Sequence, residues 1–196
     1  MKTIKKLHLI IVLIALVNVS MLRSQNAPTT QTTPTVEVFP KGYIGLSIGG
    51  ASLTKDISNA SGGIQANINF GYLFTEHVGI AATAFATSYK LSNYDNATVG
   101  LSGTLVGPLF STLSGNGAIQ FDFRPAIGLA QGTVTVGSVS GNTDDFVFAA
   151  GAGASVRWNC SRKISLSANF DYFSGKPDDV DLSSYGLTVG INYRLK

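Results

Sequence analysis

The sequence predicts an all-β fold, and two observations carry that prediction. Apolar and polar residues alternate with a period of two in several segments, as in strands that have one apolar and one polar face. After the first 24 residues, no segment has the apolar period of a sustained amphipathic helix. The length of residues 25–196 suits one all-β domain. We therefore expect a closed antiparallel up-and-down barrel, with eight strands as the preferred count.

The chain begins with the basic segment Met1–Lys6, followed by the apolar run Leu7–Val17. At about eleven residues, this run is shorter than the roughly 20 that a membrane-spanning helix needs. A basic segment followed by a short apolar run is typical of a secretory signal peptide. We predict a signal peptide over residues 1–24, cleaved near Ser24–Gln25; an uncleaved anchor helix is the alternative.

Removal of that segment changes the charge of the chain. The formal net charge of +3 includes Lys2, Lys5, Lys6 and Arg23, so residues 25–196 carry −1. The basic balance of the full sequence is therefore no sign of nucleic-acid binding. Residues 25–40 are rich in Thr and Pro, have little to bury, and are expected to be a flexible linker.

The first four strands are expected at Gly42–Ser52, Ile64–Phe74, Val78–Tyr89 and Thr98–Phe110. The second alternates most clearly, because Gln65, Asn67 and Asn69 oppose apolar neighbours. The third is rich in Ala and alternates weakly. The fourth places Val99, Leu101 and Leu105 together on one face.

The last four strands are expected at Gly117–Gln131, Phe146–Trp158, Ile164–Phe173 and Ser184–Lys196. Pro125 has no N–H for a strand ladder and suggests a bulge or a kink. The stretch Thr133–Val139 either extends a hairpin or hides two further strands, which would make ten.

The connections between these strands alternate in length. The longer ones are Leu53–Gly63, Lys90–Ala97, Gly132–Asp145 and Gly175–Ser183; the shorter ones are Thr75–His77, Thr112–Asn116 and Asn159–Lys163. Long loops on one side and short turns on the other are typical of a transmembrane β-barrel.

The polar strand faces lack the Lys and Glu of a water-exposed surface. Their charges are of mixed sign and lie among amides and hydroxyls, which favours an enclosed, paired network. The predicted interior polar network consists of Asp122, Arg124, Arg157, Asn169, Asp171, Asn192 and Arg194. The apolar faces would then point outward into lipid. A soluble exported barrel with an apolar interior remains the alternative.

Aromatic residues gather near the strand ends, as in the interfacial girdles of membrane barrels. They are Tyr43, Phe70, Tyr72, Phe74, Phe110, Trp158, Tyr172, Tyr185 and Tyr193. We expect them to face the membrane interfaces.

The opening segment Tyr43–Gly50 and the closing segment Val189–Leu195 resemble the bacterial outer-membrane β-barrel family. This family includes outer membrane protein X and the membrane domain of outer membrane protein A. The resemblance covers residues 41–196 and implies an outer-membrane location. It also implies recognition of the last strand by the barrel assembly machinery. Members of the family usually end in an aromatic residue, whereas this chain ends in Lys196.

The sequence shows no catalytic constellation, no metal site and no cofactor motif. His8 lies in the signal segment and His77 follows Glu76 in a predicted turn, so a serine nucleophile has no base near the predicted outer rim. One cysteine, Cys160, and one remaining histidine cannot fill a zinc site. The acidic loop residues Asp178–Asp181 and Asp144–Asp145 could hold calcium, although a hydrated loop is preferred.

We expect a non-enzymatic outer-membrane protein with a structural or surface-interaction role carried by its loops. A small passive porin-like channel is the alternative, and a lipid-modifying enzyme or a soluble ligand-binding barrel is less favoured. The expected partners are outer-membrane lipids, lipopolysaccharide and the assembly machinery, with no nucleic acid and with a monomeric state.

Overall fold

The computed structural model describes residues 41–53, 60–91, 96–137, 139–142, 146–175 and 182–195. They form antiparallel strands: β1 (Gly42–Leu53), β2 (Ala60–Leu73), β3 (Val78–Leu91), β4 (Ala97–Leu113), β5 (Ile119–Val136), β6 (Val139–Asn142), β7 (Val147–Asn159), β8 (Ile164–Gly175) and β9 (Leu182–Leu195). In this part of the chain, no helix is long and apolar enough to cross a membrane. The predicted signal peptide, the predicted linker and the acidic loop residues 144–145 and 178–181 lie outside the described residues.

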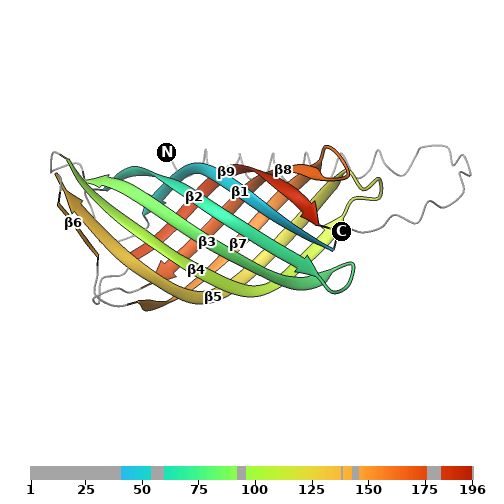
Figure 1. The fold of residues 1–196 in the computed structure, drawn as a ribbon, viewed down its shortest axis with the longest axis horizontal. Coiled ribbons are helices and arrows are strands. Elements are labelled where there is room, and N and C mark those ends of the chain that lie inside the picture. Colours follow the sequence, from blue (N-terminus) through green and yellow to red (C-terminus); the bar gives the residue numbers. More distant parts are fainter. Residues whose placement is uncertain are drawn as a thin grey trace, which may run out of the picture. The chain divides into compact units, whose positions relative to one another are not determined.

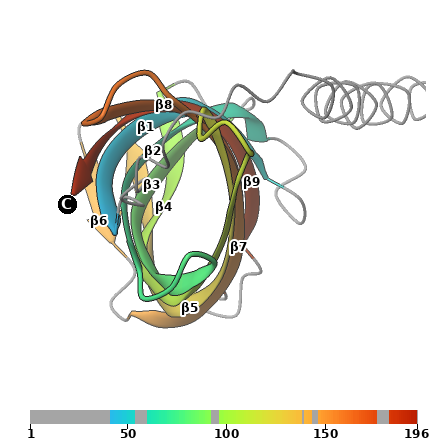
Figure 2. The same cartoon turned by 90° about the vertical axis from the view of Figure 1, so that its right-hand side faces the viewer.

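The strands close into a ring. Each strand from β1 to β4 pairs with the next one along the chain. β5 then pairs with β7, β7 with β8, and β8 with β9. The ring closes because β9 also pairs with β1. Figure 1 shows the strands strongly tilted, and Figure 2 looks into the ring. Among the described residues, eight strands form this closed antiparallel barrel, which confirms the predicted fold class.

The strand that does not belong to the ring is β6, which forms an extension of it. Within the described residues, β6 pairs with β5 alone, and Val136 opposes Val139 across their turn. β4 and β5 are also the longest strands, at 17 and 18 residues. The stretch Thr133–Val139 therefore lengthens a hairpin and adds no strand to the ring (Figure 1).

Short turns connect β2 to β3, β4 to β5 and β7 to β8 at one end of the barrel, which we call the turn end. Both ends of the barrel chain lie there, because Gly42 opposes Leu195. We call the opposite end the loop end. Gly117 has a φ of 69° and belongs to the β4–β5 turn. β5 therefore begins at Ile119, two residues later than the sequence suggested.

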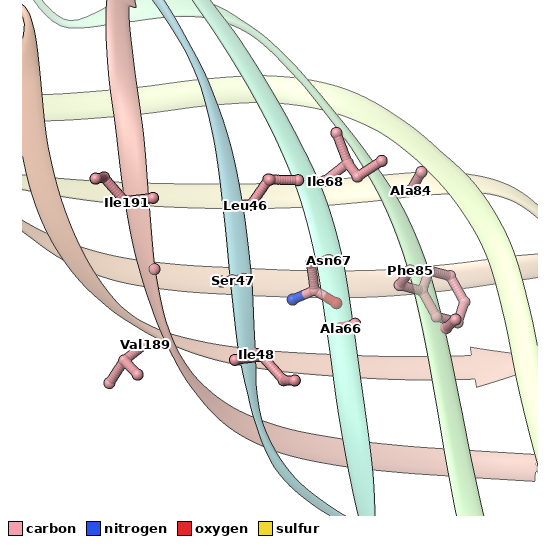
Figure 3. A pocket seen from close by; sticks show the side chains of 12 residues that line it. Leu46, Ser47, Ile48, Ala66, Asn67, Ile68, Ala84, Phe85, Val189 and Ile191 are labelled. Carbon is pink, nitrogen blue, oxygen red and sulfur yellow. The ribbon is translucent and has the colours of Figure 1, made fainter.

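The outer face is apolar and the inner face is largely polar. On β9, Leu187 and Val189 are each 68% exposed, whereas Thr188 and Asn192 are each 3% exposed. A hollow of about 590 Å³ on the outside of β9, β1, β2 and β3 is lined by side chains such as Leu46, Ile68, Val189 and Ile191 (Figure 3). It belongs to the lipid-facing surface, so it is no candidate for a water-facing binding site.

Two parts of the predicted orientation are wrong. Val99, Leu101 and Leu105 of β4 point into the barrel and are buried. Leu101 and Leu105 pack inside against Phe85 and Phe173. Tyr43, expected in an interfacial girdle, is also buried inside. As far as Leu105, the apolar face of β4 is the inner one, because these side chains fill the lumen together with residues of β3 and β8. Further along the strand, Val106 and Phe110 are exposed on the outer face.

The other aromatic residues expected in the girdles are exposed on the outer face. Of those that lie within a strand, Trp158 is the most exposed, at 61%. Of the bulge or kink expected at Pro125, the bulge is absent. Across β4 and β5, Val106 pairs with Ile127 and Phe110 pairs with Phe123 in one unbroken register. The ladder lacks only the pairs between these two, so the chain stays in register past the proline.

Candidate functional site

The candidate site is the polar interior, and its centre is an ion pair between β5 and β8. The Arg124 Nη2 atom lies 3.2 Å from Asp171 Oδ1, and both side chains are buried. β7 lies between these strands, where Gly153 opposes both residues. A Cβ at Gly153 would lie 2.5 Å from Asp171 Oδ1 and 3.0 Å from Arg124 Nη2. The absent side chain of Gly153 therefore makes the room in which this ion pair forms.

The central ion pair is bound to the opposite wall by amides of β2. Asn67 donates from Nδ2 to Asp171 Oδ2 at 2.9 Å. Arg124 donates from Nη1 to Asn69 Oδ1 at 3.2 Å, and Thr83 of β3 donates to the same oxygen at 3.0 Å. Gln65 donates to Asn67 Oδ1 at 3.1 Å. The network thus crosses the lumen and connects β2 and β3 with β5 and β8.

A second ion pair lies nearer the turn end. Arg157 of β7 approaches Asp122 of β5 with Nε at 2.7 Å from Oδ2, and Nη2 donates to Oδ1 at 3.1 Å. Ser111 of β4 donates to Asp122 Oδ1 at 2.8 Å. The Arg157 guanidinium also stacks on the Tyr43 ring, 3.6 Å from its centroid. A two-point contact and a ring face hold this guanidinium in one orientation.

The structure places the seven residues of the predicted network in three groups. Asp122 with Arg157, and Arg124 with Asp171, form the two ion pairs. Asn169 donates to Ser167 and Thr188, and Asn192 donates to the Ser165 carbonyl, so these two amides bond to neighbours on β8 and β9.

Arg194 lies apart from both ion pairs. It is only partly buried at the turn end, where its Nη1 atom donates to the carbonyl of Ser161 at 3.1 Å. The reason is its position, because Arg194 opposes Tyr43 at the start of β1 and lies next to the last described residue of the barrel.

The inward orientation of some other interior residues could be predicted from the sequence. Gln65, Asn67 and Asn69 share the polar face of a clearly alternating strand, so their inward orientation followed from the period of two. Tyr43 lies on the face of β1 opposite Ile44 and Leu46, so the same period indicated its inward orientation, although its aromatic ring suggested a girdle. Ser111 had no such signal. The contacts of both residues with Arg157 and Asp122 arise from strand pairing, which local alternation does not report.

The lumen is filled above and below the central ion pair. Towards the loop end, Phe85 and Phe173 stack with ring centroids 4.0 Å apart and an interplanar angle of 6°. Towards the turn end, Tyr43, Leu73, Ala81 and Leu109 form a second apolar cluster. An interior cavity beside Arg124 and Asp171 measures about 10 Å³, about the size of one water molecule.

The chemistry available to this interior is limited. Each buried carboxylate has one arginine, so the two charges of each pair offset each other. Within the described residues, no group of three or more His, Cys, Asp or Glu side chains could hold a metal ion. His77 lies in the β2–β3 turn, where its Nδ1 atom is 3.1 Å from the Ser111 carbonyl oxygen. The arrangement is suited to filling and bracing a barrel.

Comparisons with known proteins agree with this architecture. The model of the protein family described as "Outer membrane protein beta-barrel domain" matches residues 14–194 of this chain. Neisserial surface protein A is similar in structure, with 13% identity and a TM-score of 0.65, over 79% of this chain and 97% of that one. So is the attachment invasion locus protein Ail of Yersinia pestis in complex with a heparin analogue, with 18% identity and a TM-score of 0.50, over 78% and 99%. No curated protein matches the sequence.

Proposed function

The chain belongs to the outer-membrane β-barrel family and resides in the bacterial outer membrane, and from this premise we propose that it is a non-enzymatic surface-interaction protein. The barrel is the rigid support in this proposal. The functional surface is formed by the connections at the loop end, which face the outside of the cell because the short turns of such barrels face the periplasm.

The observation that carries the proposal is the filled lumen. Two buried ion pairs, the Phe85–Phe173 stack and the inward leucines of β4 occupy the space through which a solute would pass. Eight-stranded barrels have an interior just wide enough for side chains to fill. This packing favours a support over a channel.

The residues of the barrel also favour a non-enzymatic role. His77 is the one histidine among the described residues, and it lies at the turn end. A serine nucleophile at the loop end would need a base within about 3 Å. Neither the loop-end part of the described strands nor the sequence of the loops offers a histidine for that role.

We propose lipopolysaccharide as the partner of the loops, bridged by divalent cations. The loop connections hold seven Asp and three Lys residues, so they are net acidic, as are the phosphates of lipopolysaccharide. Divalent cations with oxygen ligands would join the two. The Ail structure contains sucrose octasulfate. A sulfated sugar would be repelled by acidic loops without such a cation.

The closed ring leaves no strand edge of the barrel wall to pair with a second copy, so we propose a monomer. β9 ends with the outward residues Tyr193 and Leu195. We propose that this aromatic and apolar rhythm is what the barrel assembly machinery recognises, despite the terminal Lys196.

Conductance of refolded protein in a planar bilayer tests the proposal. We expect no steady conductance, because side chains occupy the lumen. A steady, ohmic conductance would instead establish the passive channel. The loops are tested separately by the triple variant Asp178→Asn, Asp179→Asn and Asp181→Asn, which should weaken Mg²⁺-dependent binding to lipopolysaccharide. Glu76→Gln, at the turn end, is the control and should leave that binding unchanged.

A further inference from the structure

We propose that the turn end carries a binding site for the phosphate groups of anionic phospholipids, built from Lys41, Arg162 and Lys163 and held in place by Arg194. The site lies on the sector formed by the start of β1, the β7–β8 turn and the end of β9. It is separate from the loops, so it neither depends on the proposed function nor supports it.

Strand pairing brings these residues together. Gly42 opposes Leu195 and Tyr43 opposes Arg194, so the start of β1 lies beside the end of β9. Ile164 opposes Tyr193, and the Arg194 amide donates to the Lys163 carbonyl at 2.7 Å. The β7–β8 turn therefore lies beside the same strand end. Four basic side chains from three segments share one part of the rim.

The positive charge of this sector is not neutralised by protein among the described residues. The two ion pairs of the described residues, Arg124–Asp171 and Arg157–Asp122, are both inside the barrel and involve none of these four basic side chains. Lys41, Arg162 and Lys163 are exposed. The rest of the turn end is different, because the β2–β3 turn carries Glu76 and the β4–β5 turn, residues 114–118, has no charged side chain. The turn end is therefore basic on one side only.

The β7–β8 turn is ordered by its own hydrogen bonds. The Ser161 hydroxyl accepts from the amides of Lys163 at 3.2 Å and Ile164 at 3.0 Å, and the Ser161 amide donates to the Ile164 carbonyl at 3.0 Å. Arg194 adds the bond from Nη1 to the Ser161 carbonyl. Arg162 and Lys163 thus project from a turn of fixed shape, which lowers the entropy lost on binding.

Aromatic neighbours place this turn at the depth of lipid headgroups. Trp158 is 61% exposed and precedes the turn on β7, and Tyr193 is 49% exposed on β9. Exposed Trp and Tyr of membrane proteins are enriched at the membrane–water interface. The basic side chains a few residues beyond them reach the phosphates, and clusters of such side chains attract anionic lipids.

The chain contains a built-in probe for this site, because Trp158 is its single tryptophan. We would refold the full chain into phosphatidylcholine vesicles that contain phosphatidylglycerol, and brominate the acyl chains of one lipid at a time. Bromine quenches tryptophan fluorescence on contact. Quenching of Trp158 at equal mole fractions of brominated lipid then reports which lipid lies next to the turn.

We expect brominated phosphatidylglycerol to quench at least about twofold more efficiently than brominated phosphatidylcholine, with the difference falling as salt is added. The double variant Arg162→Gln and Lys163→Gln should abolish the difference. Lys90→Gln, which removes one cation at the loop end, should leave it intact. Equal quenching by the two lipids in the wild-type protein, or a preference that survives the double variant, would overturn the proposal.

Discussion

Pro108 of β4 and Pro125 of β5 lie directly opposite each other, midway between the pairs Val106–Ile127 and Phe110–Phe123. In an antiparallel ladder, every second facing pair exchanges two N–H···O bonds. The break in the ladder fits a proline pair at such a position, because neither residue has an N–H to give. Because a proline has no N–H, neither proline carbonyl has a ladder donor in the residue opposite it. The neighbouring residues on the same face are exposed to the outside, so this gap in the ladder lies in the lipid-facing wall.

Substitution of one proline should restore one hydrogen bond to the interrupted β4–β5 ladder. Pro125→Val supplies an N–H that can donate to the Pro108 carbonyl. Such a bond contributes about 0.5–1.5 kcal/mol, and loss of a proline costs about 0.4–1 kcal/mol through a less restricted unfolded chain. Because these contributions nearly offset each other in the free energy of unfolding, amide hydrogen exchange is the better measurement.

We expect the amides of Phe123 and Ile127 to exchange more slowly in Pro125→Val than in the wild-type protein. Pro108→Val, which repairs the other bond, should slow exchange at Val106 and Phe110. Exchange that is unchanged or faster in both variants would show that the prolines are not what interrupts the ladder.

The central ion pair should be costly to break from one side. Asp171→Asn leaves the Arg124 guanidinium buried without a charged partner, which should lower the free energy of unfolding by about 3–5 kcal/mol. Urea unfolding of the barrel refolded into vesicles measures it. Glu76→Gln, an exposed acid in a turn, should stay within about 0.5 kcal/mol. An Asp171→Asn effect as small as that of Glu76→Gln would contradict the placement of the pair.

Glycine at position 153 should be required by the same ion pair. Gly153→Ala brings a Cβ into contact with Asp171 and Arg124, and we expect a loss of about 1–3 kcal/mol in the free energy of unfolding. Gly50→Ala is the matched control, because a Cβ there meets nothing within 4 Å. Equal effects of the two substitutions would mean that the side chains around Gly153 move aside.

The orientation of the wall can be measured with spin labels. Labels at Leu187 and Ile191 should be broadened by oxygen dissolved in lipid, because these residues are 68% and 52% exposed on the outer face. Labels at Asn169 and Asn192 should be shielded from lipid, since both side chains are buried inside. The reverse pattern, with positions 169 and 192 in bulk water, would mean that the apolar face lines the interior.

Alternation in the sequence was sufficient to predict most of this barrel. In β2, β8 and β9 one face is apolar over most of its length and the other carries mainly amides and hydroxyls, so the orientation follows once the apolar face is assigned to lipid. The same alternation also predicted that the four charged residues of the two ion pairs point inward. Which acid pairs with which arginine could not be assigned, because that depends on the register between strands that are far apart in the sequence.

β4 shows where this reasoning ends. Its leucines alternate as they would on a lipid-facing strand, yet Leu101 and Leu105 are each 1% exposed and lie against Phe85 and Phe173. A period of two identifies two faces but does not say which one points inward. The inward orientation of β4 depends on an apolar cluster whose other members come from β3, β5, β7 and β8, and local sequence does not report it.

The barrel closes between its first and last strands, in a ladder that runs from Gly42 and Leu195 to Leu53 and Ser184. These are the pairs with the greatest separation along the chain, and contacts of such separation are slow to form. Until β9 has arrived, the remaining sheet has two free edges, each a template for adding a foreign strand. A chain that stops before residue 182 would therefore be expected to aggregate rather than to form a smaller barrel.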